Sequence, residues 1–338
     1  MKAKTAKREL DMLHGAIWNK IPLFALPVAA TAILEQLFNA SDIAIVGNFT
    51  GAQRTAAVAA VGANSPIISL LVNLFVGIAL GANVVIAHAI GQGDKNTVKK
   101  AVHTSILVSL LGGVLVAALG ELAAAPLLRL LQVPDDVFPL ALLYLRIYLL
   151  GMPVILLYNF EAAIFRSVGE TKIPLLALAV SGVVNVALNL FFVAVLGMTV
   201  NGVAIATVIS QIISVFLVMR CLLRFDGWAK ISLRQIRLYR SEAVQMMQIG
   251  LPAGLQSMLF NISNVMVQSA VNSFGADVVA ANTASGNIGN FTYTAQNSVY
   301  HAAITFTSQN LGARRYDRID RIFWGSCAAV CIIGVPLS

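Results

Sequence analysis

Four long stretches of this chain contain no Asp, Glu, Lys or Arg, and they constrain its fold more than any other feature. They cover residues 55–93, 173–219, 243–276 and 278–313. A helix that crosses a bilayer needs about 20 mainly apolar residues, so each stretch has room for one or two such helices. Only 11% of the residues are charged, whereas a typical soluble domain has about 25%. The chain is therefore predicted to be an all-α polytopic membrane protein.

Hydropathy and the positions of Gly and Pro predict nine membrane spans. These cover residues 20–46, 57–88, 101–123, 138–162, 174–197, 202–222, 244–273, 283–309 and 319–338. Of the 23 Lys and Arg residues, 20 lie in alternate connecting segments, beginning with the N-terminal tail. Since Lys and Arg concentrate on the cytoplasmic side of a membrane, we expect the N-terminus in the cytoplasm. The net charge of +8 then reflects topology, and we expect no nucleic-acid partner.

The beginning of the chain is repeated about 225 residues later. The segment "ALPVAATAILEQLFNASDIAIVGNF" around Pro27 aligns with "GLPAGLQSMLFNISNVMVQSAVNSF" around Pro252. The period contains six spans, so both copies enter the membrane from the same side and are related by an axis along the membrane normal. We expect a six-helix lobe over residues 1–223, a basic cytoplasmic linker over 224–241 and an incomplete second lobe over 242–338. Two complete repeats would hold twelve helices, so we expect a C-terminally truncated chain that is inactive without the missing helices.

One carboxylate and several neutral oxygens are predicted to lie at a common depth in the first lobe. Counting about 1.5 Å per helical residue places Asp42 in the outer half of the first span. Asn189 of the fifth span and Thr207 of the sixth lie at the same depth, and Asn185 is one turn from Asn189 on the same helix face. Such oxygens suit a hard cation such as Na⁺, or a proton. The alternative is helix packing through Asn and Thr hydrogen bonds.

A second group of polar and aromatic residues is predicted to line a substrate cavity. Ionisable residues inside spans are functional candidates, and Glu35 lies near the membrane midplane. Lipid does not tolerate a polar stripe, so the polar faces of the seventh and eighth spans must face protein or a water-filled cavity. The predicted cavity residues are Glu35, Phe38, Asn39, Asn261, Asn264, Gln268, Asn290, Tyr293, Asn297 and Tyr300. Packing between helices is the alternative interpretation.

Three motifs resemble those of the multidrug and toxic compound extrusion family of secondary transporters. They are "FNASDIAIVG" in the first span, "FRSVGETKIP" after the fourth and "NGVAIATVISQ" at the start of the sixth. The resemblance covers the chain from the first span to the ninth, and it implies twelve helices in two six-helix lobes around a central cavity. It also implies efflux of cationic, amphipathic compounds coupled to inward Na⁺ or H⁺ flow. It assigns the first-lobe cation site to Asp42, Asn185, Asn189 and Thr207.

Two departures from the family pattern bear on coupling. Position 189 is Asn, where some relatives carry a second Asp, and this weakens a proton relay made of two carboxylates. The seventh span lacks the Glu found in another branch, which argues against that branch's cation site in the second lobe. In the repeat, Val267 and Phe260 stand opposite Asp42 and Glu35. The choice between Na⁺ and H⁺ stays open.

The leading hypothesis is a secondary antiporter that exports cationic or amphipathic drugs by alternating access. Removal of Asp42 from water disfavours its charged form, so binding of Na⁺ or H⁺ would favour one arrangement of the lobes. The alternative is a lipid-linked saccharide flippase, whose anionic headgroup needs basic cavity residues. Arg146 is the one basic residue expected deep in the membrane. HExxH and Walker A sequences are absent, so an enzyme or an ATP-driven pump is disfavoured.

The remaining expectations concern the setting of the protein. We expect multi-pass insertion in a prokaryotic cytoplasmic membrane, with the lipid bilayer and small cationic substrates as partners. We expect a monomer, and no cofactor apart from the coupling Na⁺ or H⁺.

Overall fold

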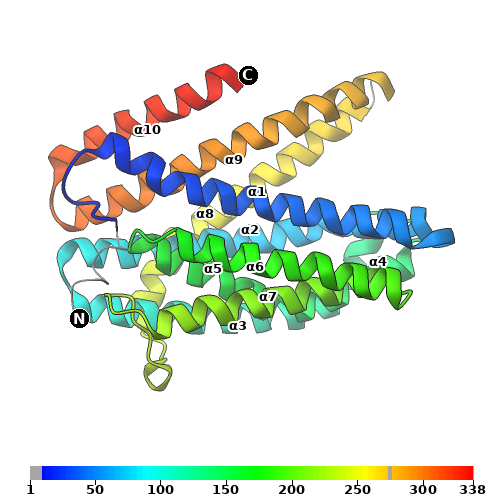
Figure 1. The fold of residues 1–338 in the computed structure, drawn as a ribbon, viewed down its shortest axis with the longest axis horizontal. Coiled ribbons are helices and arrows are strands. Elements are labelled where there is room, and N and C mark those ends of the chain that lie inside the picture. Colours follow the sequence, from blue (N-terminus) through cyan, green and yellow to red (C-terminus); the bar gives the residue numbers. More distant parts are fainter. Residues whose placement is uncertain (1–9, 273–275, 338) are drawn as a thin grey trace.

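The computed structural model is a bundle of long α-helices (Figure 1). It describes residues 10–272 and 276–337, and these residues contain ten α-helices and no strand. The helices are α1 (Ile17–Phe49), α2 (Arg54–Gln92), α3 (Lys95–Leu130), α4 (Phe138–Leu150), α5 (Met152–Ser167), α6 (Lys172–Asn189), α7 (Val200–Leu223), α8 (Arg240–Asn272), α9 (Ala276–Gly312) and α10 (Tyr316–Leu337). The prediction of an all-α protein is confirmed.

Each predicted span corresponds to one helix, except the fourth, which is formed by two. Helices α4 and α5 meet at a 50° bend, where Gly151 separates them and Pro153 stands in the first turn of α5. Proline has no backbone N–H to donate, so a helix readily breaks before it. In the described part of the chain, five helices are long and apolar enough to cross a membrane, or six if α4 and α5 form one span. Crossing by α8, α9 and α10 stays a prediction.

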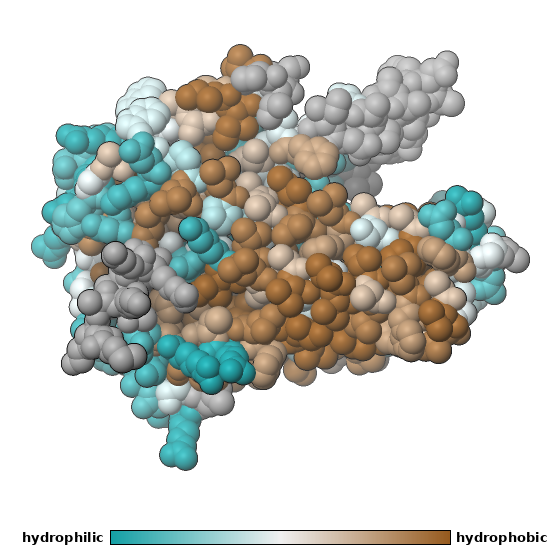
Figure 2. Space-filling view, in the orientation of Figure 1, coloured by the Kyte–Doolittle hydropathy of each residue, from teal (hydrophilic) through white to brown (hydrophobic). Residues whose placement is uncertain are grey.

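The surface of the bundle carries an apolar belt. In Figure 2, hydrophobic residues in brown cover the middle of this face, and hydrophilic residues in teal gather towards its ends. Leu122, Leu176 and Val183 are among the most exposed large apolar side chains. Apolar patches of this extent mark a surface that contacts something other than water. Together with the long apolar helices, the belt identifies a polytopic membrane protein.

Helices α2 and α8 cross at very close range. A Cβ placed on Gly77 would lie 2.2 Å from the backbone nitrogen of Gly254, and one placed on Gly81 would lie 2.8 Å from that of Gly250. The glycines are four residues apart on both helices, in "GIALG" and "GLPAG". This small-xxx-small pattern lets the backbones of two membrane helices meet. Residues with side chains could not occupy these positions at the observed helix separation.

Hydrogen bonds join α9 to α2 and α5 towards the same end of the bundle. Thr305 donates from Oγ1 to Asn83 Oδ1 at 3.0 Å, and Asn83 donates from Nδ2 to the carbonyl of Ala163 at 3.1 Å. Gln309 donates from Nε2 to the carbonyl of Ser167 at 2.7 Å. At the opposite end, α8 and α9 diverge from α1 and α2 (Figure 1). The bundle is therefore closed at the end that carries the N-terminus of α1.

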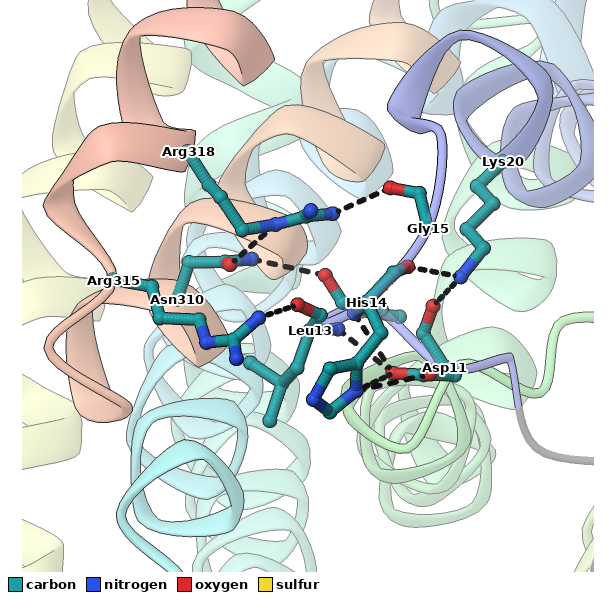
Figure 3. Close-up of polar contacts among 9 residues, drawn as sticks. Asp11, Leu13, His14, Gly15, Lys20, Asn310, Arg315 and Arg318 are labelled. Atoms are coloured by element: carbon teal, nitrogen blue, oxygen red, sulfur yellow. Dashed lines mark hydrogen bonds and ion pairs between the residues drawn. The ribbon is translucent and has the colours of Figure 1, made fainter.

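The segment before α1 adds to this closure, and we call it the N-terminal latch (residues 11–16; Figure 3). Three side chains donate hydrogen bonds to its backbone carbonyls: Asn310 to Met12 at 3.1 Å, Arg315 to Leu13 at 2.5 Å and Arg318 to Gly15 at 3.1 Å. The side chain of Met12 is buried in an apolar cluster that includes Phe24 and Phe306. The latch thus ties the start of α1 to α9 and α10.

Helix pairing follows the predicted repeat. The first helix of each repeat packs against the second helix of the other, α1 against α9 and α8 against α2. Residues between α7 and α8 contain one short 3₁₀ turn, Leu233–Gln235, within the expected linker. The lobe boundaries at 1–223, 224–241 and 242–338 stay a prediction.

Candidate functional site

The four residues of the predicted cation site meet where α1, α6 and α7 come together. Asn189 donates from Nδ2 to Asp42 Oδ1 at 2.5 Å, and Thr207 donates from Oγ1 to Asp42 Oδ2 at 3.3 Å. Asn189 Nδ2 also donates to Asn185 Oδ1 at 3.2 Å. Asp42 is only 5% exposed, so its carboxylate is held almost entirely by neutral protein groups.

The backbone after Asn189 has a feature that the sequence did not predict. Helix α6 continues as a π-helical turn over Leu190–Val195, and such turns occur frequently at functional sites. The amide oxygen Oδ1 of Asn189 is buried, without a hydrogen-bond partner in the described structure. It is therefore a further oxygen available to a bound cation, beside Asp42 and Thr207.

The donor set of the predicted site suits a particular kind of cation. Asp42 forms no ion pair within 4.0 Å in the described part of the chain. Its neighbours are amide and hydroxyl groups, and the described residues include no group of three or more His, Cys, Asp or Glu placed to hold a metal. One carboxylate with neutral oxygens suits a proton or a hard cation such as Na⁺, since transition metals prefer imidazole and thiolate ligands.

A cavity of about 540 Å³ lies beside the predicted cation site, lined by residues of α1, α2, α4, α5, α6, α7 and α9. Asp42, Asn185 and Thr207 form part of its wall, so the predicted cation site opens directly onto this space. Four of the predicted cavity residues also line it: Glu35, Phe38, Asn39 and Asn297. The ring of Phe38 lies against Gly182, where a Cβ would overlap it.

Other predicted cavity residues lie away from this cavity. Tyr293 stacks on Phe260 with ring centroids 6.4 Å apart, and Tyr293 and Tyr300 are 55% and 48% exposed. The residues outside the cavity lining are Asn261, Asn264, Asn290, Tyr293 and Tyr300. The physical reason is the divergence of α8 and the adjoining part of α9 from α1 (Figure 1). The side chain of Gln268 lies outside the described residues, and a substrate role for all six stays a prediction.

Arg166 is the cavity residue that sequence reasoning placed elsewhere. Its position near a helix end indicated a cytoplasmic loop, whereas the structure places it in α5, in the cavity wall. Ile155, Asn159 and Ala162 line the same wall, so the spacing of one helical face could have identified it. Arg146, the other arginine considered, pairs with Glu121 at 3.5 Å and is not part of the cavity lining.

Comparison with known proteins identifies the family. Residues 27–191 and 252–338 match the MatE family. The chain is 30% identical over 320 residues to "Probable multidrug resistance protein YoeA" of Bacillus subtilis (strain 168), covering 91% of this chain and 67% of that protein. It is 28% identical over 272 residues to "Probable multidrug resistance protein YpnP" of the same organism, covering 80% of this chain and 60% of that protein.

Solved structures show the same fold. The crystal structure of a MATE protein in the bent conformation matches with a TM-score of 0.90 at 23% identity, over 100% of this chain and 74% of that one. The chain spans about 60–67% of the length of the two Bacillus subtilis relatives. The motifs, the helical bundle and these matches agree, and the chain belongs to the MatE family of multi-pass membrane transporters, the multidrug and toxic compound extrusion proteins, which are not enzymes.

Proposed function

We propose that the protein is a secondary antiporter that exports small cationic or amphipathic compounds in exchange for inward Na⁺ or H⁺. The observation that carries this proposal is the position of Asp42, a buried carboxylate without an ion-pair partner in the described chain, in the wall of a drug-sized cavity. The names of the two Bacillus subtilis relatives, probable multidrug resistance proteins, support export of small molecules.

The charge distribution supports an orientation for this transporter. With the basic segments in the cytoplasm, the closed end of the bundle faces the cytoplasm, together with the N-terminal latch. The end at which α8 and α9 diverge then faces outwards (Figure 1). We therefore assign the structure to an outward-open arrangement of a monomer in a prokaryotic plasma membrane.

Exchange follows from competition for one negative charge. When Asp42 is ionised, the Nδ2 group of Asn189 and the hydroxyl of Thr207 donate to it. When Na⁺ binds, rotation of the Asn189 amide would present its free Oδ1 as a ligand, and when H⁺ binds, the carboxyl loses its charge. Either event removes the negative charge of Asp42 and so weakens the attraction of this wall for a cationic substrate. The ion and the drug would thus stabilise different arrangements of the helices.

A lipid-linked saccharide flippase is the weaker alternative. A pyrophosphate headgroup carries several charges and needs several basic partners. Arg166 is the one Lys or Arg among the described residues that line the cavity. The names of the relatives also favour small-molecule export over lipid transport.

The test is transport by an Asp42→Asn variant in proteoliposomes. We expect gradient-driven movement of a fluorescent cationic dye to be lost, because the neutral amide cannot exchange Na⁺ or H⁺. Asp135→Asn is the matched control, since Asp135 is exposed between α3 and α4, and it should transport normally. Imposing a Na⁺ gradient and a pH gradient separately identifies the coupling ion. Normal gradient-driven transport by Asp42→Asn would overturn the proposal.

A further inference from the structure

Two opposite charges line the cavity without pairing with each other. Glu35 projects from α1 onto the cavity surface, and Arg166 of α5 lies half-buried in the same cavity. Among the described residues, neither side chain makes a hydrogen bond within 3.5 Å or an ion pair within 4.0 Å. Tyr158, which also lines the cavity, donates its hydroxyl proton to the carbonyl of Pro174 at 3.2 Å rather than accepting a bond from Arg166.

This arrangement differs from a structural ion pair. A charge removed from bulk water is costly unless it is paired and hydrogen-bonded, and even the half-exposed Arg146 lies within 3.5 Å of Glu121. Glu35 and Arg166 instead leave their charges facing open space. Glu35 and Asp42 are the carboxylates of the described lining, and Arg166 is its guanidinium. The cavity is therefore dipolar, with both charges available to a ligand.

The chemistry of each group indicates what it would bind. A carboxylate attracts a substrate ammonium or a delocalised cation, whereas guanidinium presents a planar fork of donors that matches a carboxylate or a phosphate. His301 of α9 lines the same cavity and supplies an additional ring nitrogen. A volume of about 540 Å³ falls in the range of drug-sized sites, about 300–1,000 Å³.

We propose that Arg166 is a specificity residue that binds an anionic group of the substrate, so that the preferred substrate is a zwitterion. This proposal rests on the proposed export function and refines its substrate class. Such a molecule places its cation at Glu35 and its carboxylate at Arg166, and it satisfies both charges at once. A purely cationic molecule satisfies Glu35 and leaves Arg166 unpaired.

Two dyes of the same shape provide the test. Rhodamine 110 carries a free carboxylate beside its cationic ring system, and rhodamine 123 is its methyl ester, a cation alone. Binding to the purified protein in detergent is measured by fluorescence anisotropy. The wild-type protein should bind rhodamine 110 more tightly than rhodamine 123. Arg166→Gln should weaken rhodamine 110 by about tenfold or more, the effect of one lost charge-assisted hydrogen bond, and change rhodamine 123 by less than about twofold.

Three further variants distinguish recognition from a structural role. Arg166→Lys keeps the positive charge but loses the planar fork of donors, so its preference for rhodamine 110 over rhodamine 123 should lie between those of wild type and Arg166→Gln. Glu35→Gln should weaken both dyes, and Arg146→Gln, which removes an arginine outside the cavity, should weaken neither. The proposal is overturned if the wild-type protein binds rhodamine 123 more tightly than rhodamine 110. It is also overturned if Arg166→Gln and Arg166→Lys each weaken the binding of both dyes by the same factor.

The result is also separable from the proposed antiport. If the dye preference is insensitive to Arg166 but Asp42→Asn abolishes gradient-driven export of rhodamine 123, the function stands and the specificity proposal fails. If wild type shows no gradient-driven export of either dye while the Arg166 variants change the binding preference, antiport fails and the recognition site stands.

Discussion

The close packing of α2 against α8 can be tested by adding a single methyl group. Gly77→Ala adds a Cβ that would lie 2.2 Å from the nitrogen of Gly254 and 2.3 Å from its Cα. Favourable carbon contacts lie at about 3.5–4.0 Å, so α2 and α8 must separate by about 1 Å or more. The atoms in the way belong to the backbone of a long helix, which cannot rotate aside as the tip of a side chain can.

The size of the effect follows from the cost of overpacking. Forcing an extra carbon into a packed interface typically costs about 1–3 kcal/mol. The strain falls on the arrangement in which α2 and α8 touch, so that arrangement should lose about 5- to 150-fold in population relative to one in which they separate. Gly62→Ala is the matched control on the same helix, because its added Cβ has no atom within 4 Å.

The assay measures the exposure of a buried position at the closed end. Ser167 is fully buried, and its carbonyl accepts a hydrogen bond from α9. In a background with Cys221, Cys327 and Cys331 replaced by Ser, a Ser167→Cys variant should react slowly with a bulky maleimide. Gly77→Ala should accelerate the reaction by about 5- to 150-fold, the same factor by which the closed arrangement loses population. Equal maleimide reaction rates in Gly77→Ala and Gly62→Ala would refute the reasoning, provided that thermal unfolding curves show both variants to be folded.

Two further predictions concern segments outside the predicted spans. Arg318→Gln removes both hydrogen bonds that Arg318 makes to Gly15 and Asn310, worth about 1.5–3 kcal/mol each for a charged donor, and should speed hydrogen exchange in the N-terminal latch. The control Arg321→Gln, at an exposed residue, should leave this exchange unchanged, and equal exchange in the two variants contradicts the latch. Asp94 caps α3, and hydrogen bonds from the hydroxyl and amide of Thr97 hold the pKa of Asp94 below its usual range. Its stabilising contribution is therefore present above the usual Asp pKa, about 3.9, and is lost as the pH falls through the lowered value. Exchange protection in the first turn of α3 should fall in strongly acidic solution, and Asp94→Ala should remove this pH dependence; an unchanged profile in Asp94→Ala would exclude it.

The height of a residue along its predicted span could be worked out from the sequence, and this explains why the residues of the predicted cation site meet. The distance of a residue from the end of its helix follows from counting residues. Asp42, Asn189 and Thr207 were predicted at one depth, and the structure brings them within hydrogen-bond distance. The predicted spans lie on helices, the fourth on the pair α4 and α5, for a related reason. In lipid the backbone N–H and C=O groups of a charge-free stretch must be satisfied by helical hydrogen bonds.

The rotation and tilt of each helix could not be predicted in the same way, because they depend on tertiary packing. The 50° bend between α4 and α5 is one such feature, and Arg166, at the far end of α5, lines the cavity instead of a loop. The divergence of α9 from α1 is another, and it leaves Tyr293 and Tyr300 outside the lining although the stripe on their helix was recognised. The close approach of α2 and α8 was visible in principle as two small-xxx-small patterns.

The π-helical turn after Asn189 determines where α6 can lose a single residue. A π turn holds one residue more than an α turn, so deletion of one residue within Leu190–Val195 can restore an ordinary α-helix there. The residues before the deletion, including Asn185 and Asn189, would still be oriented towards Asp42. The same deletion one turn earlier would rotate the end of α6 by about 100°, the angle per α-helical residue, and carry Asn189 away from the carboxylate. Single-residue deletions should therefore be tolerated after Asn189 and not before it, with binding of a cationic dye as the measure of an intact site.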